Sequence, residues 1–402
     1  MAADLHLPHQ RAAANQTLTA QCHCKAVHFT VTVPTSALPL PVHLCHCSIC
    51  RYTHGTLCSF HAPLPKGVEP EFVPPSSIAS SLTGYIHSAQ AASERFFCTT
   101  CGCHIGDRDL TLDPDTGKPE WRVATSIFSA HDEGTFQIRS HVFTDPAVEP
   151  NLATWLPSIN SRAIHVWNPH PNDPHFPLAS SPPPKPDLDD TNLLLSQCHC
   201  AGVRFTLPRP SESEASDPFL ARYLRPSPTP SSFQKKEKDD TTTTLTGPAT
   251  IKRIACVCVC SDCRLVSGAH AVPWTFAPLK RIQPPIPPGF EGFGTLRAYR
   301  SSEKVTRAFC GVCGATVFYA LDVAERTPCE EKRVVDVAVG LLRDWEGRAA
   351  VEEWVTWRTG RLAGVRSGLE FDRGFAEGLG EGLASWGVKR HGESVTFNIP
   401  QD

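Results

Sequence analysis

The sequence has no long apolar run. The stretch MAADLHLPHQRAAANQ at its start carries no hydrophobic segment of signal-peptide length, and no part of the chain reaches the roughly 18 apolar residues of a membrane span. Secreted disulfide scaffolds are usually short chains that follow a signal peptide. We therefore expect a protein of a reducing, intracellular compartment, the cytoplasm, with no membrane partner.

The chain also lacks a strong charge of either sign. Its 38 Lys and Arg residues are offset by 41 Asp and Glu residues, so the net charge is −3. Nucleic-acid-binding domains usually carry a basic excess, so nucleic acid is not an expected partner. Proline is abundant, at 37 of 402 residues, which predicts that part of the chain is linker.

Cysteine is the informative residue. The 18 cysteines fall into tight groups, and only Cys58 and Cys329 stand alone. In a reducing compartment, grouped thiols are more often metal ligands than disulfides. The groups are Cys22 and Cys24; Cys45, Cys47 and Cys50; Cys98, Cys101 and Cys103; Cys198 and Cys200; Cys256, Cys258, Cys260 and Cys263; and Cys310 and Cys313.

The groups recur as two copies of one pattern. QCHCKAVHFTV returns as QCHCAGVRFTL after 176 residues, CHCSICRYTHG returns as CVCSDCRLVSG after 213, and FFCTTCG returns as AFCGVCG after 212. The second copy therefore carries 37 extra residues between its first and second motifs. The interval from the second motif to the third is nearly constant, 48 residues in one copy and 47 in the other.

This repeat predicts two mainly β domains. Alternating, β-branched segments such as CKAVHFTVTV read as strands, and WRVATSIF and RVVDVAVGLL read as buried strands. We place the first domain, copy one, at 17–160, a Pro-rich linker at 161–191, the second domain, copy two, at 192–370 and a C-terminal extension at 371–402. Segment 208–249, rich in Pro, Ser, Thr and charge, is expected to be a disordered insertion.

The first and third motifs together offer four thiols. Two alternate cysteines cannot complete a tetrahedron, and a C-x-x-C-G turn supplies two more sulfurs that face one ion. Four thiolates make a closed structural zinc site. The two sets are Cys22, Cys24, Cys98 and Cys101, and Cys198, Cys200, Cys310 and Cys313.

The middle motif offers three thiols, Cys45, Cys47 and Cys50 in copy one and Cys258, Cys260 and Cys263 in copy two. Three thiolates leave a fourth position open, which is the mark of a catalytic zinc site. The alternative is a second structural site, closed by His46, His54 or Cys58 in copy one, or by Cys256 in copy two. Up to four zinc ions per chain are expected, although thiolates alone also suit iron–sulfur clusters.

The motif order C-x-C, C-x-C-x-x-C-R with a following Gly, and F-C-x-x-C-G resembles the glutathione-dependent formaldehyde-activating enzyme and centromere protein V family. Arg51 and Gly55, and Arg264 and Gly268, match the family's positions after the third thiol. His141, Phe143 and Trp155 resemble its closing segment, whereas 351–357 in copy two does so loosely. The resemblance implies an Mss4-like zinc fold, structural zinc on the four-thiol set and active-site zinc on Cys45, Cys47 and Cys50.

The resemblance also implies an activity, the making or breaking of a carbon–sulfur bond with glutathione and formaldehyde as substrates. Arg51, beside the three catalytic thiols, and Arg264 in copy two are then expected to bind a substrate carboxylate. The alternative for each arginine is a surface salt bridge or a bond to the zinc thiolates. The competing hypothesis is a non-catalytic zinc-binding module that mediates protein interaction. An open cavity that reaches a three-thiol cluster would distinguish the two.

We further expect copy one to carry most of the activity. It has His46 between its first two active-site thiols, where copy two has the apolar Val259. Copy two also has the extra thiol Cys256, and its 37 additional residues enter just before the three-thiol motif, where they would cover the site.

Overall fold

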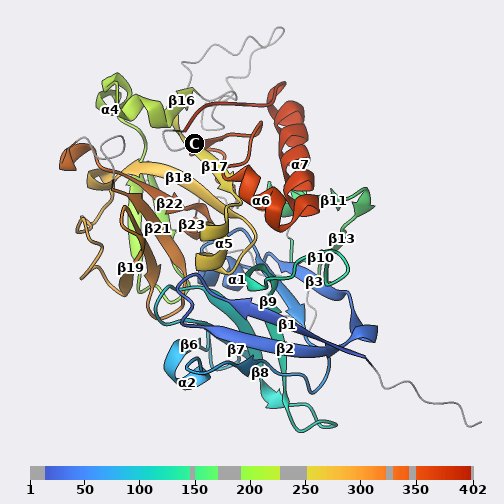
Figure 1. The fold of residues 1–402 in the computed structure, drawn as a ribbon. Coiled ribbons are helices and arrows are strands. Elements are labelled where there is room, and N and C mark those ends of the chain that lie inside the picture. The colour runs from blue at the N-terminus through green and yellow to red at the C-terminus, as the bar shows by residue number, and fades with distance from the viewer. Residues whose placement is uncertain are drawn as a thin grey trace, which may run out of the picture.

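The computed structural model describes residues 14–144, 150–170, 192–226, 251–322, 329–343 and 350–399. It is mainly β, as predicted, and each copy of the repeat builds its own large sheet (Figure 1). Among the described residues, no helix is both long and apolar enough to cross a membrane.

Copy one holds a small and a large sheet. The small sheet has the order β1-β2-β5 and the large one β13-β10-β3-β4-β9-β8-β7-β6. The elements are β1 (Asn15–Gln21), β2 (His28–Pro34), β3 (Leu40–Cys45), α1 (Ser48–His54), β4 (Ser59–Pro63), β5 (Glu71–Phe72), α2 (Ile78–Ser81), β6 (Leu82–Tyr85), β7 (Ser93–Cys98), β8 (His104–Leu112), β9 (Pro119–Ala124), β10 (Phe136–Val142), α3 (Leu152–Trp155), β11 (Ser158–Ile159), β12 (Arg162–Ala163) and β13 (His165–Trp167).

Copy two repeats this plan. Its small sheet is β15-β14-β23, and its large sheet is β16-β17-β18-β22-β21-β20-β19 with β24 parallel to β17, as β10 is parallel to β3. The elements are β14 (Leu193–Gln197), β15 (Arg204–Pro208), α4 (Glu212–Ser216), β16 (Leu224–Pro226), β17 (Ile251–Cys258), α5 (Ser261–Ser267), β18 (Val272–Pro278), β19 (Leu296–Ser302), β20 (Val305–Cys310), β21 (Thr316–Leu321), β22 (Val334–Ala338), β23 (Leu342–Arg343), β24 (Val355–Trp357), α6 (Val365–Phe371) and α7 (Arg373–His391).

Short 3-10 turns follow several strands. The 3-10 turns of the described residues are η1 (Thr35–Ala37), η2 (Thr125–Ile127), η4 (Leu220–Tyr223), η5 (Leu279–Arg281), η6 (Glu330–Lys332) and η7 (Val339–Leu341). The segments WRVATSIF and RVVDVAVGLL therefore each contain a buried strand, β9 or β22, that ends in such a turn. The strand β2 alternates buried and half-buried residues, so one face lies on the core, as its sequence pattern predicts.

The two copies pack against each other with pseudo-twofold reciprocity. His23 N donates to Leu265 O at 3.2 Å, and its counterpart His199 N donates to Tyr52 O at 3.0 Å. Gly55 ends α1 with φ +74°, and a Cβ there would lie 2.1 Å from Thr316 O. The glycine after the third thiol is therefore required by the turn and also by this contact between copies.

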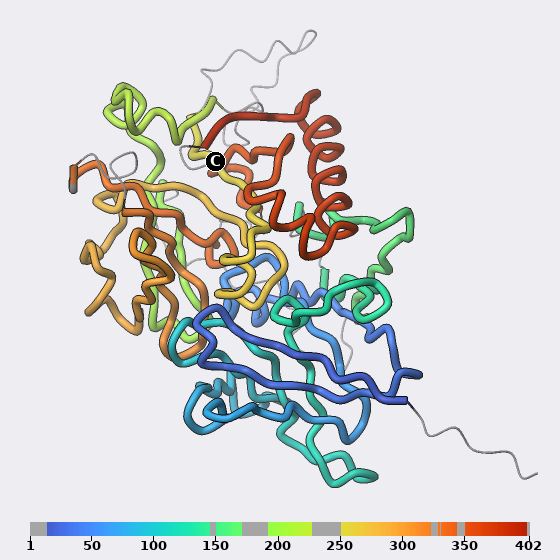
Figure 2. The backbone as a smooth tube through the Cα atoms, viewed as in Figure 1, coloured from blue at the N-terminus to red at the C-terminus, as the bar shows by residue number. Residues whose placement is uncertain are grey.

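The C-terminal extension packs against the rest of the fold. The helix α7 buries Phe375, Leu379 and Leu383, and it contacts α3 and β11 of copy one. Figure 2 shows it in red beside the green segment of copy one. The segment SVTFNI has a strand-like pattern, but its residues, 394–399, form no strand in the described part of the chain.

Two other expectations also differ from the structure. Residues 162–167 form β12 and β13, so the first part of the expected linker belongs to copy one. Residues 208–226 of the expected disordered insertion are ordered through α4, η4 and β16, since Tyr223 is buried and Glu214 forms a buried ion pair with Arg253 at 2.9 Å. Residues 171–191 and 227–250 lie outside the described part of the chain.

Candidate functional site

Each four-thiol set predicted from the sequence comes together in space. Within each set, the four sulfur atoms lie within 4.8 Å of one another. The sets are Cys22, Cys24, Cys98 and Cys101 in copy one, and Cys198, Cys200, Cys310 and Cys313 in copy two. In copy one, the first pair follows β1 of the small sheet, and the second pair lies at the end of β7 and in the turn after it. The cluster therefore joins the small sheet to the large one.

The four-thiol clusters have the donor set that a closed zinc site needs. All 18 cysteines are free thiols. The sulfurs of Cys24 and Cys98 lie 3.5 Å apart, close to the spacing of two ligands on one tetrahedral ion. Interaction with Cys198 lowers the pKa of Cys200 to about 7, so a thiolate is available there near neutral pH.

The three-thiol clusters form where a strand meets a short helix. Cys45 ends β3, Cys47 is the N-cap of α1, and the Cys47 sulfur accepts the backbone N–H of Cys50 at 3.4 Å. The sulfurs of Cys45, Cys47 and Cys50 lie within 4.8 Å of one another, as do those of Cys258, Cys260 and Cys263 around β17 and α5. All three ligands come from one local segment, in contrast to the four-thiol clusters.

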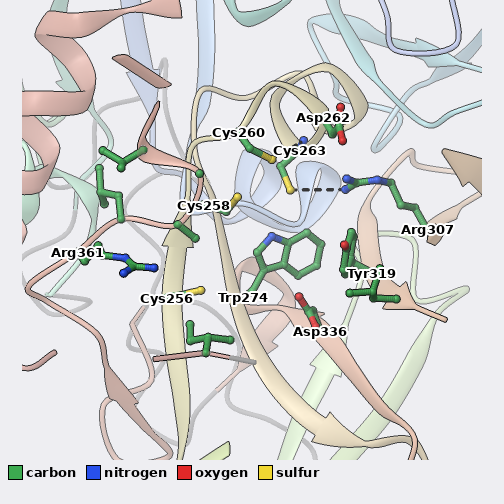
Figure 3. Close-up of a pocket in the computed structure, with 16 residues that line it drawn as sticks. Cys256, Cys258, Cys260, Asp262, Cys263, Trp274, Arg307, Tyr319, Asp336 and Arg361 are labelled. Atoms are coloured by element: carbon green, nitrogen blue, oxygen red, sulfur yellow. Dashed lines mark hydrogen bonds between the residues drawn. The ribbon is translucent and has the colours of Figure 1, made fainter. Parts of the chain in front are cut away.

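None of the alternative fourth ligands belongs to these clusters. The His46 imidazole bonds His141 at 2.9 Å, and His54 Nδ1 donates to the Cys50 carbonyl at 2.9 Å. Cys58 is buried and outside the cluster, and Cys256 lies on β17 away from the three sulfurs (Figure 3). Each three-thiol cluster thus keeps an open position among the described residues.

A cavity of about 520 Å³ reaches the three sulfurs of copy two. Figure 3 shows the thiols at one end of the cavity, with Trp274 and Tyr319 along a wall and Arg361 on another side. None of the described residues of the 208–249 segment lines this cavity. The ordered part of the segment therefore does not cover the site, although the extra residues of copy two were expected to do so. This cavity is the feature that distinguishes a small-molecule site from a purely structural one.

An arginine that the sequence reasoning missed contacts each open cluster. Arg307 Nη1 donates to Cys263 Sγ at 3.5 Å, and Arg95 Nη2 approaches Cys50 Sγ at 4.0 Å. The pKa of Cys263 is held well below its usual range by Cys258 and Cys260, and Arg307 adds to this effect. A sequence signal existed, because Arg stands three residues before the C-x-x-C turn in both copies, as RFFC and RAFC.

The arginines that follow the third thiol are buried elsewhere. Arg264 donates to the Ser126 carbonyl of copy one, its guanidinium lies 3.5 Å from the centre of the Phe371 ring, and burial lowers its pKa to about 10. It is absent from the cavity lining. Arg51 is also buried, with its guanidinium 5.3 Å from the centre of the Tyr52 ring. A substrate-binding role for Arg51 stays a prediction.

His46 is bonded to another histidine and not to the thiols, which removes one of the three reasons for expecting most of the activity in copy one. Its ring is buried and bonds to His141, whose Nε2 donates to Leu156 O at 2.9 Å. Burial lowers the pKa of His141 to about 4, so this pair is uncharged at neutral pH. Alternate residues of an extended chain point to opposite sides, so the residue between two ligand thiols points away from them.

The two three-thiol sites share their strand arrangement but differ in the side chains at equivalent positions of these strands. The strand registers place His61 of copy one where copy two has Trp274, and Asp107 where copy two has Tyr319. His61 Nδ1 and Asp107 Oδ2 lie 2.9 Å apart. Copy one therefore has a polar pair at the positions where copy two has an aromatic pair.

Reciprocal side-chain contacts also join the two copies. His23 of copy one bonds the Tyr299 hydroxyl at 2.7 Å, and its Nε2 lies 3.5 Å from Asp262, which lines the cavity of copy two. The reciprocal contact joins His199 to the Tyr85 hydroxyl at 2.7 Å. The interface between the copies therefore includes a matching histidine–tyrosine hydrogen bond from each side.

The comparison with protein families agrees with this geometry. The family of the glutathione-dependent formaldehyde-activating enzyme matches residues 17–145 and again residues 240–357, which is more than half of the chain. No match is found among curated proteins. The two matched segments, each with its own four-thiol and three-thiol motifs, show that the chain belongs to the glutathione-dependent formaldehyde-activating enzyme family and carries two tandem copies of its domain.

Proposed function

We propose that this protein is a zinc-dependent enzyme of the carbon–sulfur lyase type, which makes or breaks the adduct of a thiol such as glutathione with formaldehyde. The observation that carries the proposal is the open three-thiol cluster at the end of a 520 Å³ cavity. A non-catalytic zinc module for protein interaction, the alternative, does not require such a cavity. All cysteines are free thiols, which supports a reducing compartment and, as a proposal, the cytoplasm.

The residues fit the metal that the family implies. Three sulfurs within 4.8 Å of one another cannot all ionise without a cation among them, and the pKa of Cys258 is accordingly raised by Cys260 and Cys263. Thiolates are preferred zinc ligands. Cys258, Cys260 and Cys263, and Cys45, Cys47 and Cys50, would hold the ions. When bound, zinc would supply a Lewis acid with one exchangeable position.

The protein's own residues would bind and orient the substrate. Arg307 keeps a fixed positive charge beside Cys263. Burial alone would lower the pKa of Arg307, but the Cys263 thiolate and neighbouring groups raise it by more, so the net shift is upward. The Arg361 side chain lines the cavity on another side and is the candidate partner for a carboxylate of the thiol substrate. Trp274 and Tyr319 would exclude water from one wall of the cavity.

The reaction balances without a redox partner. The thiolate sulfur donates an electron pair to the carbonyl carbon, and the carbon–sulfur bond forms. The electron pair of the C=O π bond moves to oxygen, which takes up the proton that the thiol released. Cleavage of the adduct is the reverse. We propose this chemistry for both copies, since both have the three thiols and the adjoining arginine.

The test is a rate assay of adduct formation from glutathione and formaldehyde with zinc-loaded protein. Combining Cys47→Ser with Cys260→Ser should reduce the rate to the spontaneous one. Cys329→Ser, which removes an exposed thiol outside every cluster, is the control and should leave the rate unchanged. A rate in the double variant equal to that of the unaltered protein would contradict the proposal.

A further inference from the structure

A fifth cluster of metal-binding side chains lies where copy one, copy two and α7 meet. It consists of His131, His270 and Asp372, each with one ligand atom within 4.8 Å of the others. His131 precedes β10, His270 follows α5, and Asp372 is the N-cap of α7. Three segments remote in the sequence thus converge on one point, and none of them belongs to a thiol motif.

The hydrogen bonds of His270 leave one ring nitrogen without a partner. Its Nε2 lies 3.0 Å from the Thr125 hydroxyl, which itself donates to the Phe60 carbonyl at 3.3 Å. The hydroxyl has one hydrogen, so it accepts from Nε2–H, and Nδ1 of the neutral ring is then an acceptor. This Nδ1 has no hydrogen-bond partner and lies 3.9 Å from Asp372 Oδ2.

His131 is similarly unsatisfied. Its side chain is 2% exposed, and neither ring nitrogen has a partner in hydrogen-bond geometry, although Nδ1 lies 3.2 Å from Asp372 Oδ2. Asp372 Oδ1 is already used, since it accepts the backbone N–H of Phe375 at 2.9 Å. Buried polar atoms without partners are costly, so a cation between these nitrogens and Oδ2 would be stabilised there.

Aromatic rings hold the two imidazoles in place. Phe60 stacks on His270 with 4.7 Å between ring centroids, and Phe136 stacks on His131 at 5.4 Å. Among the described residues, Asp372 forms no ion pair with a lysine or arginine, and the Arg264 guanidinium is bonded to the Ser126 carbonyl instead. The carboxylate therefore has no fixed cation as a partner.

We propose that His131, His270 and Asp372 bind one divalent transition metal ion of the zinc class, which links both copies to the start of α7. Two ligands of a tetrahedral zinc at about 2.0–2.1 Å lie about 3.3 Å apart, and the distances of 3.2 and 3.9 Å are close to that value. Two imidazoles with one carboxylate suit zinc rather than magnesium or calcium, which prefer all-oxygen sites. The site is independent of the proposed catalytic function.

The experiment measures zinc per chain by elemental analysis after dialysis of the reduced, full-length protein against buffered Zn²⁺. The unaltered protein should hold one zinc more than the Asp372→Asn variant. Asparagine keeps the N-cap acceptor for Phe375, so α7 should remain intact. His131→Gln leaves the cap untouched and should lose the same ion. His165→Gln, at an exposed histidine, is the matched control and should lose none.

Cobalt identifies which site is lost. Co²⁺ added to protein whose thiol clusters already hold zinc should give visible d–d absorption without thiolate-to-cobalt charge transfer. That absorption should vanish in Asp372→Asn and His131→Gln. Equal zinc content in all variants, or identical cobalt spectra, would overturn the proposal.

Discussion

At the scale of single residues, a guanidinium beside one thiol distinguishes the open clusters from the closed ones. Arg307 lies 3.5 Å from Cys263, and Arg95 lies 4.0 Å from Cys50. A hydrogen bond to a charged group contributes about 1.5–3 kcal/mol. Replacing both arginines by methionine should therefore slow adduct formation by about ten- to a hundredfold. The Arg297→Met variant, which alters an exposed arginine on β19, should keep the full rate; an equal loss there would refute the role.

A second prediction at this scale concerns acid stability. Burial lowers the pKa of His141 to about 4, whereas the unfolded chain has the ordinary value near 6.5. As the pH falls from 7 to 5, the unfolded state takes up the proton first, so the free energy of unfolding decreases. His141 should account for about 2 kcal/mol of that decrease. Urea unfolding at both pH values should show a smaller decrease in His141→Gln, and an unchanged decrease would contradict the assignment.

Some of the metal-ligating residues could be predicted from the sequence and others could not. Spacing and repetition identify the 14 thiols of the four clusters, because each cluster is made of short motifs that occur twice. The cluster of His131, His270 and Asp372 has no such signal, since it is assembled by packing between segments far apart in the chain. The orientation of His46 away from the thiols likewise depends on its partner His141, on a different strand.

At the scale of elements, the two kinds of cluster differ in what they connect. Cys22 and Cys24 follow β1 of the small sheet, whereas Cys98 and Cys101 belong to the β7–β8 turn of the large one. The three-thiol cluster uses ligands from the single junction of β3 and α1. Removing a ligand from the first kind therefore disconnects two sheets, and removing one from the second kind does not.

This contrast predicts different outcomes for two serine substitutions. Cys98→Ser should unfold or strongly destabilise copy one, because binding of a structural zinc contributes directly to folding. Cys47→Ser should leave copy one folded and inactive. Thermal unfolding followed by circular dichroism compares them, and an equal loss of thermal stability would remove the distinction between structural and catalytic sites.

The features that local sequence reports poorly are those stabilised by distant partners. The helix α7 has repeated glycines that weaken its helical pattern, but its apolar side chains at 375, 379 and 383 are buried in the assembled fold. Glu214 lies in a charge-rich segment that suggests disorder, and its carboxylate is paired with Arg253. Local composition does not report such long-range contacts.

At the scale of the whole molecule, the two copies form a reciprocal interface within one chain. Gly55 and Gly268 occupy equivalent positions, and a Cβ at either would approach a backbone oxygen of the other copy, at 2.1 Å from Thr316 O or 2.3 Å from His104 O. The contact depends on tertiary packing, so the sequence motif that contains each glycine does not reveal it.

Alanine substitutions test this interface. Gly55→Ala should lower the free energy of unfolding more than Gly117→Ala does. Both glycines have positive φ, +74° and +66°, so each substitution carries about 1–2 kcal/mol of backbone strain. Only Gly55 adds a clash, since nothing lies within 4 Å of a Cβ at Gly117. Equal destabilisation of the two variants would show that the copies do not depend on this contact.

At this scale the protein should hold two metal centres closed by four thiolates and two open centres with three. Zinc K-edge X-ray absorption tests this arrangement most directly, on zinc-loaded protein that carries Asp372→Asn so that only thiol sites contribute. We predict about 3.5 sulfur ligands per zinc, rising towards four when glutathione is added. About four sulfurs per zinc before addition, with no change afterwards, would contradict the open sites and with them the proposed catalytic role.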